Sequence, residues 1–254
     1  MFEKMKMNGE AVVVTGGGAG IGKSTAMAAA EMGATAVICG RTEATLKEAQ
    51  ADIRGRGFAC EYFVADVSNE ADVQALAAFV AGKWGSAKGV VNNAGNNFSS
   101  LLHELPTAKW HELVATNLDS VYYMCREFIP LLLKSKAPSI VNIASTFGVI
   151  GNPKMPVYCA TKGAVVNLTR QLAIDYGAQG LRVNSVCPGS TLSPRYKGYV
   201  DKGMVDVEAA KSRIMLRRIA ECDEIGNVAA FLLSDAASFV TGATIVVDGG
   251  QTIH

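Results

Sequence analysis

The chain has 254 residues, of which 49% are hydrophobic, and its formal net charge is +1. This length and composition suit one α/β domain or two small ones with a buried core, and they exclude a disordered chain. The near-neutral charge predicts no basic face for nucleic acid, and no apolar run approaches the roughly 18 residues that span a bilayer, so we expect neither partner.

Cysteine and histidine usage narrows the class further. The six cysteines are widely spaced without a C-x-x-C pair, and most have apolar neighbours, which is typical of small core residues in a reducing compartment. The first ten residues are charged and do not resemble a secretion signal. We therefore expect a cytoplasmic protein without disulfides. Three histidines are too few for most metal sites, so no catalytic metal is expected.

Apolar runs and helical patterns alternate along the chain. The first expected strand, 11–15, leads into a glycine-rich loop and an alanine-rich helix to about residue 32. Further strands are expected at 34–40, 61–66, 89–95, 139–145, 181–189 and 243–250, and the longest helices at about 108–136 and 157–177. Near-continuous apolar strands indicate burial on both faces. We predict an α/β fold: one Rossmann-type domain over residues 1–254, doubly wound, with a seven-stranded parallel sheet and helices on both faces.

The stretch "TGGGAGIGKST", Thr15 to Thr25, fits two phosphate-binding patterns. From Gly17 it spells G-x-x-x-x-G-K-S, the P-loop of nucleoside triphosphatases, and Asp66 at an expected strand end would then hold magnesium. From Thr15 it spells T-G-x-x-x-G-x-G, a dinucleotide loop. Both patterns use close backbone approach and the positive end of a helix to bind phosphate, so the loop alone does not decide between them.

Three later residues favour redox chemistry. Ser145 ends an expected strand, Tyr158 follows thirteen residues on, and Lys162 shares a helix face with Tyr158 at i+4. Hydride transfer from a carbinol carbon requires a group that exchanges the hydroxyl proton. The pKa of a tyrosine, about 10, must be lowered for that task, and Lys162 supplies positive charge. Ser145 would hold the substrate oxygen by a hydrogen bond.

Together with "NNAG" at 92–95, Asn117 and the final "VTGATIVVDGG", these motifs resemble the short-chain dehydrogenase/reductase family over nearly the whole chain. The resemblance implies an oxidoreductase that transfers hydride between NAD(P)(H) and a secondary alcohol or ketone, and it makes the P-loop pattern a coincidence. It implies catalytic roles for Asn117, Ser145, Tyr158 and Lys162, with Asn117 organising a water-linked proton relay. It also implies a homotetramer, or a homodimer, and cofactor contacts from Gly16, Gly18, Gly20, Ile21, Gly22, Arg41, Thr42, Asp66, Val67, Asn93, Ala94, Gly95, Tyr158, Lys162, Pro188, Gly189 and Thr191.

The second strand decides the expected cofactor. It ends "VICGRTE", with Gly40 where dinucleotide folds usually place an acid for the ribose hydroxyls. Because Arg41 follows and a guanidinium binds phosphate in a bidentate manner, we expect NADP(H), with Arg41 and Thr42 at the 2′-phosphate. In the alternative, the cofactor is NAD(H), Arg41 is a solvated loop charge and Glu43 contacts the ribose.

The substrate is less constrained. The segment after Pro188 is basic, so Arg195, Tyr196 or Lys197 would meet an anionic or polyhydroxylated substrate, unless the segment is only a solvated lid helix. The family threonine after that proline is not at its expected position, although Thr191 and Ser193 lie near it. We expect a small secondary alcohol or its ketone, a sugar or hydroxy acid among them, bound by Ser145, Phe147, Asn152 and Tyr158, with Asn96, Met155 and Ser190 as further pocket candidates.

Overall fold

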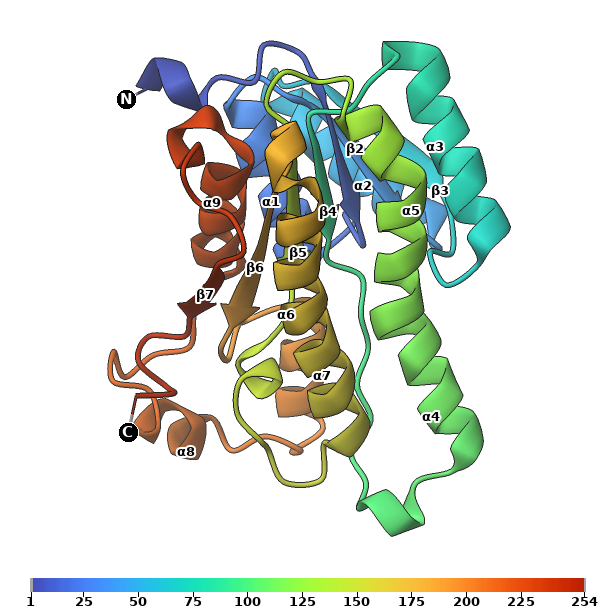
Figure 1. Ribbon diagram of the computed structural model, residues 1–254. Helices are drawn as coiled ribbons and strands as arrows, with labels where there is room; N and C mark the ends of the chain where they lie inside the picture. The colour runs from blue at the N-terminus through green and yellow to red at the C-terminus, as the bar shows by residue number, and fades with distance from the viewer. Residues whose placement is uncertain (1, 254) are drawn as a thin grey trace.

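The computed structural model describes residues 2–253 and is built around one parallel sheet (Figure 1). Within these residues the sheet has seven strands in the order β3-β2-β1-β4-β5-β6-β7. The chain starts at β1, builds outward to β3, and returns beside β1 with β4, so the crossovers lie on opposite faces. The predicted doubly wound fold is therefore confirmed. The strands are β1 Ala11–Thr15, β2 Thr35–Gly40, β3 Cys60–Val64, β4 Gly89–Asn92, β5 Ser139–Ile143, β6 Arg182–Pro188 and β7 Thr244–Val247.

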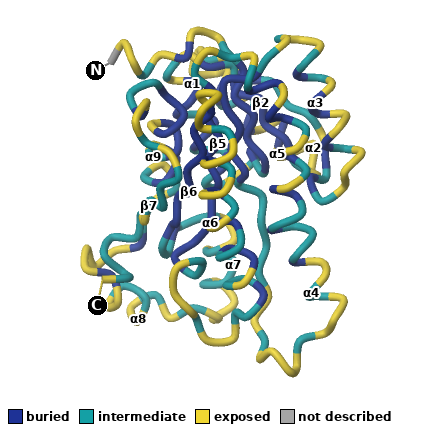
Figure 2. Tube along the Cα trace, in the orientation of Figure 1, coloured by how far each residue is buried: buried dark blue, intermediate teal, exposed yellow. Residues whose placement is uncertain are grey.

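Helices cover both faces of the sheet, and each face has its own hydrophobic core. One core packs α3, α5 and α6 against the sheet, and the other packs α1, α2 and α9. In β1, Val13 belongs to the first core and Val14 to the second, which is why this strand is apolar at successive positions. Figure 2 shows the inner strands of the sheet as the buried interior of the molecule, whereas the edge strands β3 and β7 are partly exposed. The α-helices are α1 Gly20–Glu31, α2 Glu43–Gly55, α3 Glu70–Trp84, α4 Thr107–Val114, α5 Ser120–Leu132, α6 Pro156–Tyr176, α7 Pro194–Asp201, α8 Val207–Ser212 and α9 Cys222–Leu233.

The long helix expected at about 108–136 is interrupted. A π-helical segment, Ala115–Asp119, lies between α4 and α5 and contains Asn117. Periodicity does not reveal this segment because the helical backbone continues through it. The apolar run at the end of α5 is core rather than surface, since Phe128, Ile129, Leu131 and Leu132 are buried.

Five strands end earlier than predicted; β5, β6 and β7 end at Ile143, Pro188 and Val247 rather than at residues 145, 189 and 250. β3 ends at Val64 rather than residue 66, and β4 ends at Asn92 rather than residue 95. Asp66 and the residues 93–95 therefore lie in loops beyond the carboxyl edge of the sheet, where doubly wound folds bind their ligands. No helix within residues 2–253 has the length and apolar character needed to cross a lipid bilayer.

Candidate active site

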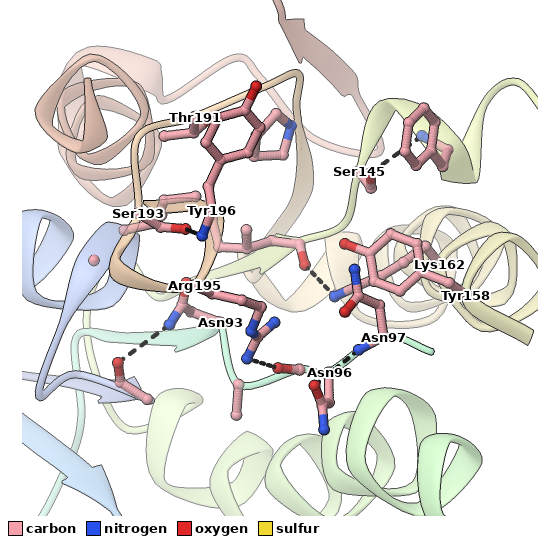
Figure 3. Close-up of a pocket in the computed structure, with 18 of the residues that line it drawn as sticks. Asn93, Asn96, Asn97, Ser145, Tyr158, Lys162, Thr191, Ser193, Arg195 and Tyr196 are labelled. Carbon is pink, nitrogen blue, oxygen red and sulfur yellow. Dashed lines mark hydrogen bonds between the residues drawn. The ribbon is translucent and has the colours of Figure 1, made fainter. Parts of the chain in front are cut away.

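A cleft of about 1270 Å³ opens at the carboxyl edge of the sheet. Its lining comes from the glycine loop after β1, the loop after β4, the turn after β5 with the start of α6 (here called the floor), and α7 and α8; Figure 3 shows several of these side chains. At one end the cleft reaches Gly40 and Arg41, at the end of β2. This volume, and the lining from the glycine loop to the end of β2, fit an extended dinucleotide.

The glycine loop presents backbone rather than side chains to the cleft. Gly16 and Gly20 have φ angles of 63° and 56°, a region that favours glycine. A Cβ on Gly22 would lie 2.3 Å from the carbonyl oxygen of Gly16, so α1 starts directly against the loop. The residue before α1, Ala19, offers no side-chain cap, and the first N–H groups of the helix are therefore free to bind an anion. These features fit the diphosphate of a dinucleotide.

The alternative P-loop interpretation is not supported. Lys23, which would have to reach the triphosphate, forms an ion pair with Asp52 at 2.7 Å and does not line the cleft. Asp66, the candidate magnesium ligand, accepts hydrogen bonds from the backbone N–H and the hydroxyl of Ser68, at 3.0 and 2.6 Å. The lysine of the pattern therefore stabilises the packing of α1 on α2.

The loop after β4 is tied to β1. The Thr15 hydroxyl accepts hydrogen bonds from the N–H groups of Asn93 and Ala94, both at 2.9 Å, and the Asn93 amide donates to the Thr15 carbonyl at 2.8 Å. Gly95 is in contact with a buried lysine, since a Cβ there would lie 3.3 Å from Lys162 Nζ. These contacts fix the loop that the resemblance assigns to the cofactor.

Ser145, Tyr158 and Lys162 all line the floor of the cleft. Ser145 caps a short 3₁₀ turn, Thr146–Gly148, and its hydroxyl accepts a hydrogen bond from the N–H of Phe147 at 3.1 Å. Lys162 donates to the carbonyl of Ile143 at 2.8 Å, and its Nζ lies 5.9 Å from the centre of the Tyr158 ring. Figure 3 shows the Lys162 and Tyr158 side chains lying close together.

Burial dominates the acid–base properties of this pair. It raises the pKa of Tyr158, whereas the Ser145 hydroxyl and the positive charge of Arg195 act to lower it. Burial, and then the nearby Arg195, lower the pKa of Lys162 from 10.5 to about 8. Each group is thus held toward its neutral form, and added charge in the cleft will shift both pKa values strongly because the surroundings have a low dielectric constant.

Asn117 does not line the cleft, although it lies beside it. The side chain is fully buried, and its oxygen accepts from the N–H of Asn96 at 2.7 Å while its nitrogen donates to the Asn96 carbonyl at 2.8 Å. The same nitrogen donates to the Thr161 hydroxyl on α6 at 3.2 Å. Asn117 therefore connects the loop after β4 to the helix that carries Tyr158 and Lys162.

At the part of the cleft next to the end of β2, Arg41 is mostly exposed, and its guanidinium lies 3.8 Å from the Asp66 carboxylate. Glu43 points to other partners: it accepts a hydrogen bond from the Tyr62 hydroxyl at 3.0 Å and pairs with Lys47 at 3.1 Å. Gly40 ends β2, so no acid stands at that position.

Most of the predicted cofactor residues line the cleft; Gly18, Gly22 and Thr42 do not. Gly18 and Gly22 pack against neighbouring backbone and side chains, and Thr42 precedes α2 as its N-cap. The predicted substrate residues also line it, except Lys197. Those in the cleft are Gly16, Gly20, Ile21, Arg41, Asp66, Val67, Asn93, Ala94, Gly95, Pro188, Gly189, Thr191, Ser145, Phe147, Asn152, Tyr158 and Lys162.

Sequence reasoning missed several lining residues. The Tyr199 hydroxyl of α7 donates to the side-chain oxygen of Asn97, and both residues line the cleft. Gln251 returns from near the end of the chain, and its side-chain oxygen accepts from the N–H of Ser190 at 3.2 Å. A hydroxyl in a basic segment and a glutamine after "DGG" are common surface features, so no local signal marks them as part of a site.

Comparisons with known proteins agree with this geometry. A family model described as Enoyl-(Acyl carrier protein) reductase matches residues 16–252. The chain is 36% identical to 2-(S)-hydroxypropyl-CoM dehydrogenase 3 of Xanthobacter autotrophicus, over 97% of this chain and 98% of that protein. It is also 36% identical to meso-2,3-butanediol dehydrogenase of Serratia marcescens, over 98% and 96%. A solved gluconate 5-dehydrogenase from Burkholderia cenocepacia, in complex with NADP and tartrate, superposes with a TM-score of 0.93 at 31% identity, covering 100% of this chain and 99% of that one.

These relatives match the chain along its whole length rather than in the glycine loop alone, and the sheet order and the cleft agree with them. The protein is an oxidoreductase that acts on CH–OH or C=O groups with a nicotinamide dinucleotide. The chain belongs to the short-chain dehydrogenase/reductase family.

Proposed function

We propose that this protein transfers hydride between NADP(H) and a small secondary alcohol or ketone, with Tyr158 as the general acid and base. The observation that carries the proposal is the placement of Tyr158 beside Lys162 and Ser145 on the floor of a cleft that also contains the glycine loop. The nicotinamide ring supplies the hydride donor or acceptor. Every other part of the reaction is assigned to the residues of this chain.

Tyr158 Oη would donate its proton to the carbonyl oxygen during reduction and accept it from the alcohol during oxidation. The Ser145 hydroxyl would hold the same oxygen and stabilise its developing charge. Lys162, while protonated, would lower the pKa of Tyr158 and so increase the fraction of phenolate available as base. Asn117 would keep the chain around Asn96 and Gly95 in place beside Lys162 and support the water-linked proton relay.

The preference for NADP(H) over NAD(H) is supported by the adenosine end of the cleft. With Gly40, β2 does not end in a carboxylate that would repel a 2′-phosphate, and the exposed guanidinium of Arg41, which has only a 3.8 Å contact with Asp66, would bind one. Glu43, the ribose ligand in the NAD(H) alternative, is already bonded to Tyr62 and Lys47. The solved relative with NADP bound adds to this support.

The substrate class rests on the relatives and on the cleft. Their names describe oxidation of small secondary alcohols, including a diol and a sugar acid. The cleft mixes Phe147 and Met155 with Asn96 and Asn152, which suits a small hydroxylated substrate; a sugar or hydroxy acid oxidised with NAD(H) is the alternative.

The further assignments follow the family. We propose one dinucleotide-binding domain over residues 1–254, a homotetramer or homodimer, and a cytoplasmic location, where the six free cysteines would remain reduced. Ile174 on α6 and Val246 on β7 leave apolar surface exposed, which is consistent with contact between copies of the chain.

The Tyr158→Phe variant tests the chemistry. We expect at least about 100-fold slower turnover of small ketones with NADPH, because the proton donor is lost, and unchanged NADPH affinity. Tyr122→Phe, which removes a hydroxyl from an exposed ring on α5, is the matched control and should retain full turnover. Turnover by Tyr158→Phe at the wild-type rate would refute the assignment.

The Arg41→Ala variant tests the cofactor. Binding titrations should show about tenfold weaker NADPH binding and unchanged NADH binding, because only NADPH carries the 2′-phosphate. A wild-type protein that binds NADH more tightly than NADPH would contradict the preference.

A further inference from the structure

The segment after β6 comes into direct contact with the phosphate-binding loop. A Cβ added to Gly20 would lie 3.4 Å from both Ser193 and Pro194, the N-cap and first residue of α7. The next residue, Arg195, extends over the cleft, and its guanidinium donates a hydrogen bond to the carbonyl of Gly95 at 2.6 Å. Figure 3 shows this side chain reaching to the loop after β4. Arg195 therefore links α7 to the loop after β4.

The charge of Arg195 has no acidic partner. No ion pair joins it to a carboxylate in the described part of the chain, and unlike the other unpaired exposed cations it lines the cleft together with Arg213. Its one hydrogen-bond acceptor is a neutral carbonyl, which does not compensate a full positive charge. The charge acts inside the cleft, since it contributes to the lowered pKa of Lys162 and partly opposes the rise that burial causes in the pKa of Tyr158.

The other cationic side chains near the glycine loop have other partners or lie at other parts of the cleft. Lys23 is paired with Asp52 outside the cleft, and Lys162 is buried against the Ile143 carbonyl. Arg41 lies at the end of β2, at the adenosine end. A dinucleotide diphosphate carries about two negative charges, and the free N–H groups of α1 supply only partial positive charge.

We propose that Arg195 binds the diphosphate of the nicotinamide dinucleotide, exchanging its hydrogen bond to Gly95 for one to a phosphate oxygen and so holding α7 against the glycine loop. This inference rests on the proposed function, because it assumes the dinucleotide lies in this cleft. It assigns Arg195 to the cofactor, whereas the basic character of the segment alone also allowed an anionic substrate or a solvated helix.

The position of Arg195 favours the cofactor over the substrate as its ligand. Both elements that α7 contacts here, the glycine loop at Gly20 and the loop at Gly95, are cofactor elements in the proposed function. The substrate side of the cleft is the turn from Ser145 to Asn152, and within residues 2–253 no hydrogen bond joins Arg195 to that turn. A guanidinium also matches phosphate oxygens in geometry and is weakly hydrated, which suits this task.

Binding titrations with three probes test the proposal: NADPH, NADH and ADP-ribose, which share the diphosphate. Arg195→Gln should weaken the binding of all three probes by about the same factor, tenfold or more. The ratio of wild-type to variant affinity should decrease as the salt concentration rises. Arg195→Lys keeps the charge and should recover part of the loss. Lys197→Gln is the matched control: it removes one charge from an exposed position of the same helix that does not line the cleft, and should bind all three probes as wild type does.

Several results would overturn the proposal: unchanged affinities in Arg195→Gln, a loss confined to NADPH, or an equal loss in Lys197→Gln. So would unchanged cofactor affinities with a raised KM for keto acids but not for neutral ketones, which would assign Arg195 to the substrate. Melting temperatures of the variants, measured without cofactor, show whether each variant is folded. Because ADP-ribose lacks the reactive ring, its binding can follow the prediction even if Tyr158→Phe shows that the proposed chemistry is wrong, so the two failures are distinguishable.

Discussion

Gly22 allows α1 to begin directly beneath the glycine loop, and Gly22→Ala should disrupt that contact. The new Cβ would lie 2.3 Å from the Gly16 carbonyl oxygen and 2.5 Å from the Asn93 amide nitrogen. Backbone must therefore move, at a cost of about 1–3 kcal/mol for overpacking. The movement also strains the hydrogen bonds from Asn93 to the carbonyls of Thr15 and Gly16, each worth about 1 kcal/mol. We expect a total loss of about 2–4 kcal/mol.

Denaturant unfolding measures this loss directly, and titration with NADPH should show weakened binding because the displaced loop is the proposed phosphate site. The matched control is Gly82→Ala in α3, where a Cβ meets no atom within 4 Å. That variant should gain about 0.5–1 kcal/mol because alanine favours a helix over glycine. A Gly22→Ala protein within about 0.5 kcal/mol of wild type would refute the reasoning.

Three further predictions concern charge and packing. Because the pKa of Lys162 is about 8 in the folded chain and 10.5 in the unfolded one, the unfolded chain binds more protons there between these pH values. Raising the pH from 8 to 10 should therefore increase the unfolding free energy of wild type relative to that of Lys162→Met, as measured by denaturant titration. A difference in unfolding free energy that does not change with pH would contradict the lowered pKa. Phe128→Ala should cost about 3–5 kcal/mol because the ring is fully buried, whereas Phe239→Ala, at a fully exposed position, should change the unfolding free energy by less than about 0.5 kcal/mol. Lys88 is buried and lies 2.6 Å from Asp235, so Asp235→Asn should cost about 1–3 kcal/mol by leaving the ammonium without its partner, and more than Lys88→Met, as measured by the same unfolding assay.

The strand pattern predicted the sheet well because burial on both faces requires apolar residues at successive positions, as in β1 and β5. Strand ends were less accurate. β4 stops at Asn92 because the Asn93 amide turns back to Thr15, a contact between residues 78 positions apart that no local pattern contains. The same limit applies to Lys23, whose pairing with Asp52 depends on how α1 packs against α2.

The candidate site was predictable where its residues lie close in sequence. Tyr158 and Lys162 are one helical turn apart, so a local motif places them together. Arg195 and Gly95 are 100 positions apart and meet only because α7 crosses the cleft. Gln251 joins the site because the chain after β7 packs on Gly189, where a Cβ would lie 2.7 Å from Asp248. Contacts between residues so far apart in sequence can be predicted only when the three-dimensional fold is known.

The π-helical segment at Ala115–Asp119 has a consequence for protein engineering. Such a segment holds one residue more than a regular α-helix would need, so deleting a single residue from α4 would restore ordinary helical hydrogen bonding. Because the flanking parts of the helix already follow that regular path, the deletion would shift residues of the segment, such as Asn117, by up to one position, which is about 100° around the helix. A stability-guided redesign that regularises this helix would therefore displace the Asn117 side chain from its contacts with Asn96. A design that replaces this helix with the corresponding helix of a relative must keep the extra residue of the π-helical segment.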